Sequence, residues 1–421
     1  MHRLVSVVIP AALLLSACHR SSTTTGAGTV AAQPSASDAP LRDAIRADLQ
    51  RVLDRARADS AFPGAYAVVG THDGVIAEYG VGQLDWAPSP RPDAHTIWDL
   101  ASLSKVVGMT TAIMQLVEQG RVDVDAPVQR YLPDWTGPNK ERVTVRHLLT
   151  HTGGLPPDQP PGSKPYDEIT HNPDSVAMLM FSTPLDTLPG IRMVYSDIGA
   201  YLLGKIVERV SGQKLDVYLR DHVFQPLAMT ETMYNPPPSL LPRIAPTEVD
   251  PRRGGLVRGK VHDERSYYLG GVSAHAGIFT SGHDLARFAR MYLNNGTLDG
   301  VRVLQPATIA RFTAYVDSIF SDRGLGWQKP DLPGMKFASP SAAWAGHSLS
   351  SRAFGHTGFT GTSIAIDPQR DLFIILLTNR VNPTRNNGKI TEVRRQLADA
   401  VVPDYDRLRS SPSGSSSTTR P

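Results

Sequence analysis

A serine and a lysine, three positions apart, carry the strongest chemical signal in this chain. Ser102 and Lys105 stand at the front of an apolar segment whose large side chains recur at helical spacing up to Gly120. Residues three apart share one face of a helix, so the amine would lie beside the hydroxyl in the first helical turn. A desolvated lysine can accept the proton of a serine hydroxyl and turn it into a nucleophile. The pair therefore predicts nucleophilic catalysis, provided that the chain supplies partners elsewhere.

Two further stretches can supply those partners. Tyr195 directly precedes a segment with helical apolar spacing, and Ser196 is expected to cap that helix at its N-terminus. Residues 355–361, with the sequence Gly-His-Thr-Gly-Phe-Thr-Gly, open a predicted strand. Glycines at this place let a substrate lie close to the backbone, and an edge N–H group can donate to a carbonyl oxygen.

The elements that must position these residues follow from hydrophobic periodicity. Strands are expected in a hairpin at 65–79 and again at 362–366 and 372–377. Between them lie short helical segments separated by loops rich in proline and glycine. Helices are expected at 41–58, 143–149, 174–181, 197–210, 215–222, 284–294, 306–313 and 390–401. We interpret this order as an α+β fold in which a central antiparallel sheet, flanked by helices, is assembled from both ends of the chain around an inserted helical region.

The same reading gives a domain organisation. Residues 41–120 and 300–406 are expected to form the sheet domain, and residues 121–299 the inserted, mostly helical region. Residues 18–40 are rich in Ser, Thr, Ala, Gly and Pro, and cannot bury enough apolar surface to fold, so they predict a flexible tether. Residues 407–421 predict a disordered tail.

The N-terminus predicts export and lipid attachment. A short basic start and an apolar run at 4–15 fit a secretory signal, because the run is too short to span a bilayer. The sequence Leu-Ser-Ala-Cys that follows resembles the bacterial lipobox, which implies that residues 1–17 are removed and that Cys18 carries the lipid. Cys18 is the only cysteine, so no internal disulfide can form. The expected location is the bacterial cell envelope, with the protein anchored to a membrane through Cys18 and facing the periplasm or the exterior.

Composition excludes several other classes of function. The chain has 41% hydrophobic and 20% charged residues and a formal charge of +3, with its basic residues scattered, so no nucleic-acid partner is expected. His147 and His151 have a spacing that can hold zinc on a helix, but glycines follow at once and no third ligand is apparent. We expect neither a metal nor a cofactor. The oligomeric state stays open.

Three motifs in chain order also carry a family resemblance. Ser-x-x-Lys at 102–105, Tyr-Ser-Asp at 195–197 and His-Thr-Gly at 356–358 together resemble the motifs of the serine β-lactamase and penicillin-binding-protein superfamily. The similarity is greatest to its class C branch, with D-alanyl-D-alanine carboxypeptidases and related esterases, and it extends to 143–155 and 261–277. It implies a β-lactamase/transpeptidase-like fold.

The resemblance also implies a role for each matching residue. Ser102 would be the acylated nucleophile, Lys105 its proton acceptor or electrostatic partner, and Tyr195 the second acid/base group. The backbone N–H groups of Ser102 and Phe359 would form the oxyanion hole. Whether Lys105 or Tyr195 takes the proton in acylation stays open.

The same resemblance places substrate contacts at His356, Thr357, Gly358 and Asp197, and two of these depart from the family pattern. Asn is commoner at position 197, and an ionised Asp there only accepts hydrogen bonds. If Asp197 faces Lys105 it should keep the lysine charged, and if it points away it should favour the helix N-terminus.

His356 stands where Lys is usual, and because histidine is mostly neutral near pH 7 a substrate carboxylate loses an anchor. Arg352, Arg380 and Arg385 are candidates to replace that cation.

These observations predict a serine hydrolase that forms an acyl-enzyme on amide or ester bonds. Its expected substrate is a small molecule or a peptidoglycan-derived peptide, as for a D,D-peptidase-type enzyme. A promiscuous short-chain carboxylesterase and a catalytically silent wall-binding protein are the alternatives. The departures at positions 197 and 356 favour esterase or peptidase activity over efficient β-lactam hydrolysis.

Overall fold

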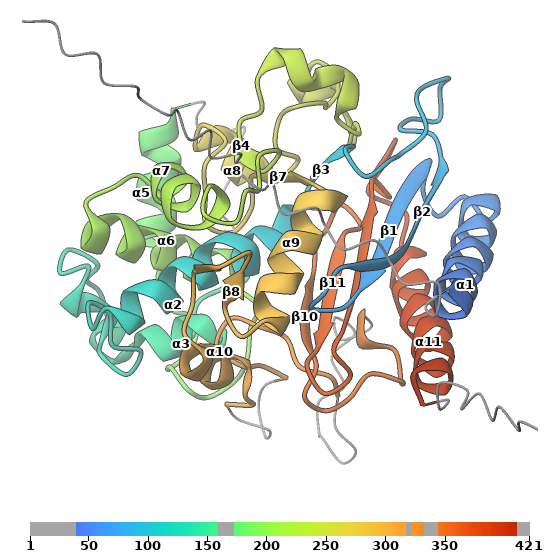
Figure 1. The fold of residues 1–421 in the computed structure, drawn as a ribbon. Coiled ribbons are helices and arrows are strands. Elements are labelled where there is room, and N and C mark those ends of the chain that lie inside the picture. Colours follow the sequence, from blue (N-terminus) through green and yellow to red (C-terminus); the bar gives the residue numbers. More distant parts are fainter. Residues whose placement is uncertain (1–38, 159–171, 317–321, 332–343, 411–421) are drawn as a thin grey trace, which may run out of the picture. The chain divides into compact units, whose positions relative to one another are not determined.

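A computed structural model describes residues 39–158, 172–316, 322–331 and 344–410 of the chain (Figure 1). Cys18, the signal peptide and most of the expected tether and tail lie outside the described residues. Among those that are described, every helix is too short or too polar to cross a membrane.

A five-stranded antiparallel sheet joins the two ends of the described chain. Its order is β10-β11-β12-β1-β2, so the C-terminal strands pair directly with the N-terminal hairpin. In the pairing of β1 with β12, Val68 lies opposite Ile375. The strands are β1 (Gly64–Gly70), β2 (Val75–Gly82), β10 (Phe354–Thr357), β11 (Ser363–Asp367) and β12 (Leu372–Thr378). The predicted sheet, assembled from both ends, is confirmed.

Alternation along β1 explains why both faces of this sheet are covered. Ala65, Ala67 and Val69 belong to a core with α1 (Ala39–Ala58) and α11 (Ile390–Arg409), whereas Tyr66 and Val68 belong to the larger core on the other side. Successive side chains of a strand point to opposite faces, so one strand serves two cores. In Figure 1, α1 and α11 run side by side along one face of the sheet.

The larger core is built mainly by helices. They are α2 (Thr111–Glu118), α3 (Val145–Leu149), α5 (Pro173–Ser182), α6 (Asp197–Ser211), α7 (Leu215–Leu219), α8 (Glu264–Tyr268), α9 (Gly282–Leu293) and α10 (Pro306–Thr313). Apart from α8, which was not predicted, their positions follow the helical spacing in the sequence closely, and α10 has the predicted bounds.

Small sheets within this part of the chain were not predicted, because their strands are too short to show alternation. One joins β3 (Ile97–Asp99), β7 (Ile278–Ser281) and β4 (Met233–Tyr234). Two-stranded pairs are formed by β5 (Val249–Asp250) with β6 (Gly255–Leu256), and by β8 (Thr297–Leu298) with β9 (Val301–Arg302).

The prediction of one regular helix running from Ser102 to Gly120 is wrong. A 3₁₀ turn at Ala101–Leu103 is followed by a π-helical segment at Lys105–Thr110, and only then by α2. The cause lies just upstream, where the Asp99 carboxylate accepts a hydrogen bond from the Ala101 N–H at 2.8 Å and Ala101 takes a φ of +46°. A non-glycine residue in this left-handed region is strained, and such strain persists only where surrounding contacts enforce it.

The predicted limits of tether and tail also need correction. Helix α1 begins at Ala39, and α11 continues to Arg409, so residues 407–409 are helical and not part of a tail. Tertiary contacts hold this end of α11: the Tyr405 hydroxyl donates to the carbonyl of Arg370 at 2.9 Å, and the Arg370 guanidinium pairs with Asp406 at 3.0 Å.

Candidate active site

The structure places Ser102 and Lys105 in direct contact. Lys105 Nζ lies 2.9 Å from Ser102 Oγ, and the lysine is only 1% exposed. The neighbouring Ser104 faces elsewhere, because its hydroxyl accepts a hydrogen bond from the Ile278 N–H at 3.1 Å. The two serines of this turn are therefore distinguished by their partners, and only Ser102 shares a hydrogen bond with the amine.

Two acceptors besides Ser102 surround the lysine amine. Nζ donates to the carbonyl oxygen of His275 at 2.9 Å and lies 2.6 Å from Asp197 Oδ1. Burial favours the neutral amine, but the Asp197 carboxylate, and after it Tyr195, outweigh burial and raise the pKa of Lys105 above its ordinary value. Lys105 is therefore an ammonium ion at neutral pH.

Asp197 is shared between Lys105 and a second cation. Arg265 Nη2 lies 2.8 Å from Asp197 Oδ2, and both arginine and aspartate side chains are largely buried. Although burial opposes ionisation, Lys105 and Arg265 hold the pKa of Asp197 well below its usual range. Of the two orientations considered from the sequence, the structure has the one in which Asp197 faces Lys105.

A ring of polar contacts behind Asp197 fixes the lysine from the other side. Arg265 also pairs with Asp263 at 3.0 Å, and Asp263 Oδ1 lies 2.9 Å from His275 Nε2. The buried His275 side chain therefore holds in place the backbone carbonyl that accepts from Lys105.

Tyr195 reaches the same place from the start of α6. Ser196 caps this helix, its hydroxyl accepting from the Gly199 N–H at 3.2 Å, and the ring of Tyr195 then lies 4.9 Å from Lys105 Nζ. His151 supports this position: its Nδ1 accepts from the Ser196 N–H at 3.1 Å, and its ring lies 4.5 Å from that of Tyr195. The sequence analysis assigned His151 no role in the site, because nothing local links it to Tyr195.

The turn between β10 and β11 is tied to the segment that precedes the nucleophile. Thr360 Oγ1 donates to the Asp99 carbonyl at 2.7 Å, and Thr362 Oγ1 donates to the Leu100 carbonyl at 3.0 Å. Gly358 packs between them so closely that a Cβ on it would lie 2.3 Å from the Leu100 oxygen. The glycine of the His-Thr-Gly motif is thus required by this close approach.

The two backbone N–H groups expected in the oxyanion hole have no acceptor. Among the described residues, no backbone carbonyl and no side chain accepts from the N–H of Ser102 or of Phe359. Arg380 fixes the Phe359 peptide by donating to its carbonyl at 2.7 Å, while the Phe359 ring stacks on His262 at 5.6 Å. Both N–H groups are therefore available to a ligand.

His356 has a cationic neighbour that sequence reasoning missed. Arg323 Nη1 lies 3.2 Å from His356 Nε2, while His356 Nδ1 lies 2.8 Å from the Thr357 carbonyl. A carbonyl only accepts and a guanidinium only donates, so this pattern assigns the proton of His356 to Nδ1. Burial and then the Arg323 charge hold the pKa of His356 well below its usual range, as expected for a neutral imidazole.

Two of the three arginines named from the sequence have other partners, and the third is exposed. Arg385 pairs with Glu248 and Glu264, each at 2.6 Å, and Arg380 binds backbone carbonyls as described above. Arg352 is exposed. The sequence signal at Arg323 was weak: it precedes a Gly-Leu-Gly-Trp segment, but no spacing relates it to His356.

One cavity of about 560 Å³ collects these features. Ser102, Tyr195, His356, Thr357, Gly358 and Phe359 line it together with Met193, Arg323, Gln328, Arg380, Gly388, Ile390, Thr391 and Arg394. Among the described residues, this lining contains arginines and no acidic side chain. Asp197 and Lys105 lie behind it, in contact with Ser102 and Tyr195.

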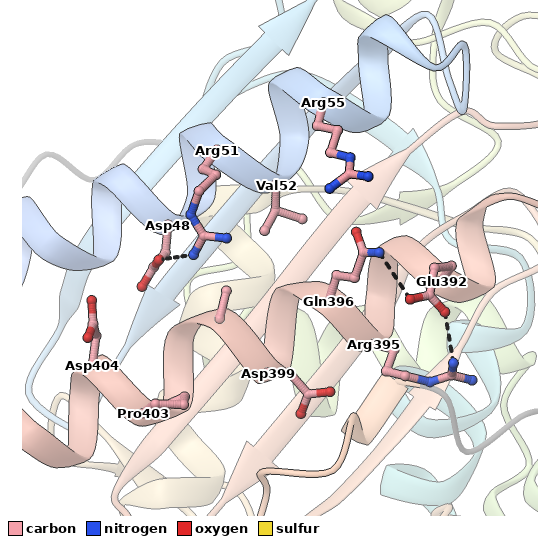
Figure 2. Close-up of a pocket in the computed structure, with 11 residues that line it drawn as sticks. Asp48, Arg51, Val52, Arg55, Glu392, Arg395, Gln396, Asp399, Pro403 and Asp404 are labelled. Carbon is pink, nitrogen blue, oxygen red and sulfur yellow. Dashed lines mark hydrogen bonds and ion pairs between the residues drawn. The ribbon is translucent and has the colours of Figure 1, made fainter.

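A second cavity, of about 450 Å³, lies between α1 and α11 (Figure 2). Figure 2 shows two ion pairs among its charged side chains: Arg51 contacts Asp48, and Arg395 pairs with Glu392, at 2.8 Å. No predicted site residue lines this cavity.

A group of potential metal ligands occurs at Glu231, His283 and Asp284. Its carboxylates already accept hydrogen bonds, Glu231 from Arg243 and Asp284 from the Thr232 hydroxyl. The group contains none of the predicted site residues.

Comparisons with known proteins agree with this geometry. The sequence model of the family described as Beta-lactamase matches residues 49–399. A protein from Salmonella agona, provisionally named D-alanyl-D-alanine carboxypeptidase, is 32% identical over 70% of this chain and 72% of its own length.

Solved structures show the same fold. EstCE1, a hydrolase with promiscuous acyltransferase activity, superimposes with a TM-score of 0.68 at 23% identity, over 87% of this chain and 100% of its own. A penicillin-binding protein homologue from Caulobacter crescentus gives a TM-score of 0.66 at 21% identity, over 87% of this chain and 98% of its own.

Proposed function

Because the chain belongs to the beta-lactamase family and is a serine hydrolase, we propose that it cleaves D-alanyl-D-alanine-type peptides through an acyl-enzyme on Ser102. The observation that carries this proposal is the contact of 2.9 Å between Lys105 Nζ and Ser102 Oγ, in a cavity also lined by Tyr195 and the His356–Phe359 segment. The provisional name of the Salmonella relative supports the same substrate class.

In the first step Ser102 Oγ bonds to the carbonyl carbon of the scissile bond, and its proton passes to Lys105 or Tyr195. Collapse of the tetrahedral intermediate then breaks the C–N bond, the proton is delivered to the leaving amine, and the acyl group stays on Ser102. The negative charge that develops on the carbonyl oxygen is stabilised by the backbone N–H groups of Ser102 and Phe359, which have no acceptor among the described residues. The Lys105 ammonium, beside Ser102 Oγ, stabilises the alkoxide as it forms. Tyr195, whose ring centre lies 4.9 Å from Lys105 Nζ, is the acid/base group on the side of the leaving amine.

Water then attacks the carbonyl carbon of the ester on Ser102. The same acid/base groups take a proton from the water and return one to Ser102 Oγ as the ester bond breaks. Asp197 keeps Lys105 charged at neutral pH, so Lys105 becomes a better acceptor for the Ser102 proton as the pH rises and the lysine loses its own. We therefore expect kcat/KM to increase with pH from neutral into the alkaline range.

Intact-mass spectrometry after exposure to D-Ala-D-Ala peptides, short esters and a small panel of β-lactams tests this proposal. The natural chain should gain the mass of an acyl group, and Ser102→Ala should gain none. Ser104→Ala is the matched control: it removes the neighbouring hydroxyl, costs about 1 kcal/mol of stability through one lost hydrogen bond, and should still be acylated.

Other outcomes separate the alternatives. Adducts and turnover with esters alone would favour the carboxylesterase. A folded protein that forms no adduct with any reagent would contradict the proposal and favour a silent wall-binding protein.

We also propose that the mature protein is a lipoprotein of the bacterial cell envelope, anchored through Cys18. The Leu-Ser-Ala-Cys sequence after a short apolar run supports this proposal. Palmitate labelling of the natural chain, lost in Cys18→Ser, is the expected result, and labelling that persists in Cys18→Ser would overturn it.

A further inference from the structure

We propose that Asp99 is a positioning residue for the oxyanion hole. Its buried side chain joins the turn that carries Ser102 to the segment against which the Phe359 ring packs, and so holds the two backbone N–H groups in place relative to each other. The inference rests on the proposed acylation of Ser102. It assigns to Asp99 a role in the reaction that needs no contact with the substrate.

The first argument is the set of partners of the Asp99 carboxylate. Oδ1 accepts from the Ala101 N–H at 2.8 Å, and Oδ2 accepts from the His262 N–H at 2.6 Å. Ala101 directly precedes Ser102, whereas His262 lies 163 residues from Asp99 along the chain. One carboxylate therefore ties the turn of the nucleophile to a distant segment.

The second argument is the contact between that segment and Phe359. The rings of His262 and Phe359 stack with their centroids 5.6 Å apart, and His262 is itself fixed, because its Nε2 lies 3.0 Å from Glu248 Oε2. In addition, the Asp99 carbonyl accepts from the Thr360 hydroxyl at 2.7 Å. Asp99 is thus connected to the Phe359 peptide by two routes, one through His262 and one through Thr360.

The third argument is the electrostatic environment of Asp99. Both hydrogen bonds to its carboxylate come from backbone N–H groups, which carry no full charge. Burial raises the pKa of Asp99 above its ordinary value, although these N–H groups and the neighbouring His262 oppose the rise. Because a carboxylate buried in this way costs folding free energy, its presence is explained by the two N–H groups that it holds.

The fourth argument is strain in the turn before Ser102. Ala101 has a φ of +46°, a left-handed conformation that residues with a Cβ rarely adopt. The hydrogen bond from its N–H to Asp99 holds it there. Such strain is released when the contacts that enforce it are lost. Without Asp99, the turn would relax and carry the Ser102 N–H away from the Phe359 N–H.

Asparagine at position 99 tests this arrangement. Asp99→Asn keeps the shape of the side chain, but its NH₂ group cannot accept, so one of the two backbone N–H groups loses its acceptor. The readout is a pair of substrates: a short aryl ester, and the thionoester in which sulfur replaces the carbonyl oxygen. Because sulfur is larger and a weaker acceptor than oxygen, two well-placed N–H groups favour the oxygen ester.

The expected loss falls on the oxygen ester. Asp99→Asn should lower its kcat/KM by about tenfold to a hundredfold and that of the thionoester by at most about threefold, since the N–H groups are displaced and not deleted. The ratio of the two kcat/KM values therefore falls. A merely structural role would lower both values alike, so equal losses on the two esters, or no loss on either, would overturn the proposal.

Asp367→Asn is the matched control. Asp367 is also buried and accepts from two backbone N–H groups, those of Ser350 at 2.9 Å and of Gln369 at 3.1 Å. It lies at the end of β11 that is away from the Phe359 turn. Asp367→Asn should therefore keep the ratio of the natural chain, and a ratio that falls as far as in Asp99→Asn would count against the proposal.

His262→Gln is a second variant, and it replaces Asp99→Asn if that variant does not fold. Glutamine keeps a hydrogen-bond donor for Glu248 but removes the ring that stacks on Phe359. The ratio of the two kcat/KM values should again fall. An unchanged ratio in folded His262→Gln would overturn the proposal.

NMR of the Phe359 amide separates this inference from the proposed function. In protein labelled with ¹⁵N at phenylalanine, the Phe359 signal is identified by its loss in Phe359→Leu. Asp99→Asn and His262→Gln should shift this signal, and Asp367→Asn should leave it in place. A natural chain that cleaves neither ester contradicts the proposed function, and the amide signal then decides: a shift supports the positioning role, and an unmoved signal in Asp99→Asn overturns it.

Discussion

Asp197 sets the charge state of Lys105. Its carboxylate lies 2.6 Å from Lys105 Nζ and 2.8 Å from Arg265 Nη2, so a single side chain compensates two buried cations. An isolated ammonium would lose its charge in such a buried place, and Asp197 prevents this. Lys105 therefore stays protonated at neutral pH. In this state it can stabilise negative charge on Ser102 Oγ, but it is a poor acceptor for a proton.

Replacing Asp197 by asparagine should therefore change the pH profile. In Asp197→Asn the attraction that raises the pKa of Lys105 is lost while burial still lowers it, so the pKa falls. We expect the rising limb of kcat/KM against pH to move to lower pH by roughly one to two units, the usual effect of one adjacent charge.

Asp158→Asn is the control for that change. Asp158 pairs with Arg265 at 2.7 Å but makes no ion pair with Lys105. The pH profile of kcat/KM for Asp158→Asn should stay close to that of the natural chain. A similar shift in Asp158→Asn and Asp197→Asn would mean that Arg265, rather than Lys105, sets the profile.

At the scale of elements, the turn between β10 and β11 is the part that joins the sheet to the nucleophile. It is fixed to Asp99 and Leu100 by the Thr360 and Thr362 hydroxyls, and to α11 by Arg394. The position of the Phe359 N–H relative to Ser102 therefore depends on contacts among three elements.

A methyl group on Gly358 should disturb this arrangement. In Gly358→Ala the new Cβ would lie 2.1 Å from Thr362 Oγ1 and 2.3 Å from the Leu100 oxygen, so the turn must move away from the nucleophile. We expect kcat to fall by about a hundredfold or more, as for loss of one oxyanion donor, with a measurable loss of thermal stability.

Gly388 provides a matched control in the same cavity. A Cβ on Gly388 would meet nothing within 4 Å, so Gly388→Ala should leave kcat within about twofold. Comparable kcat values for the two alanine variants would contradict the role given to the turn.

For the whole molecule, buried ion pairs connect segments that are distant in the sequence. Glu248 accepts from the Arg385 side chain at 2.7 Å and lies 3.0 Å from His262 Nε2, so it joins the chain before β5 to the segment after β12. Although burial opposes ionisation, the hydrogen bonds from His262 and Arg385 hold the pKa of Glu248 well below its usual range.

This pKa predicts how stability depends on pH. A carboxyl group with a depressed pKa in the folded state stabilises the fold above its unfolded pKa, and the contribution is lost as the pH falls through the folded value. Glu248→Gln should therefore lower the free energy of unfolding at pH 7 by about 2 kcal/mol, the range for hydrogen bonds to a charged group. In denaturant titrations the difference from the natural chain should shrink as the pH is lowered below 4, roughly the unfolded pKa of a glutamate.

Glu392→Gln gives the comparison for a surface pair. Its partner Arg395 is solvent-accessible, so Glu392→Gln should alter the free energy of unfolding by less than about 0.5 kcal/mol, both at pH 7 and below pH 4. If Glu248→Gln and Glu392→Gln lowered the free energy of unfolding equally, burial would not be the reason why the Glu248 network stabilises the fold.

The sequence determined those features that depend on local pattern and on order along the chain. Alternation and helical spacing predicted the α+β fold and the antiparallel sheet from both ends, because burial imposes these periods on each element separately. Motif order identified Ser102, Lys105, Tyr195 and the His356–Gly358 segment, which the structure places around one cavity or in direct contact with it.

Only the tertiary structure decided which side chains complete that cavity. Arg323 reaches His356 across 33 residues and His151 reaches Ser196 across 45, contacts that no local pattern encodes. The orientation of Asp197 and the broken helix at Ser102 were equally undetermined, because each depends on partners from other elements: Arg265 for the carboxylate, and the β3 segment with its Asp99 hydrogen bond for the turn. Charge compensation and close packing between distant segments are properties of the folded chain, so they follow from the tertiary structure and not from local pattern.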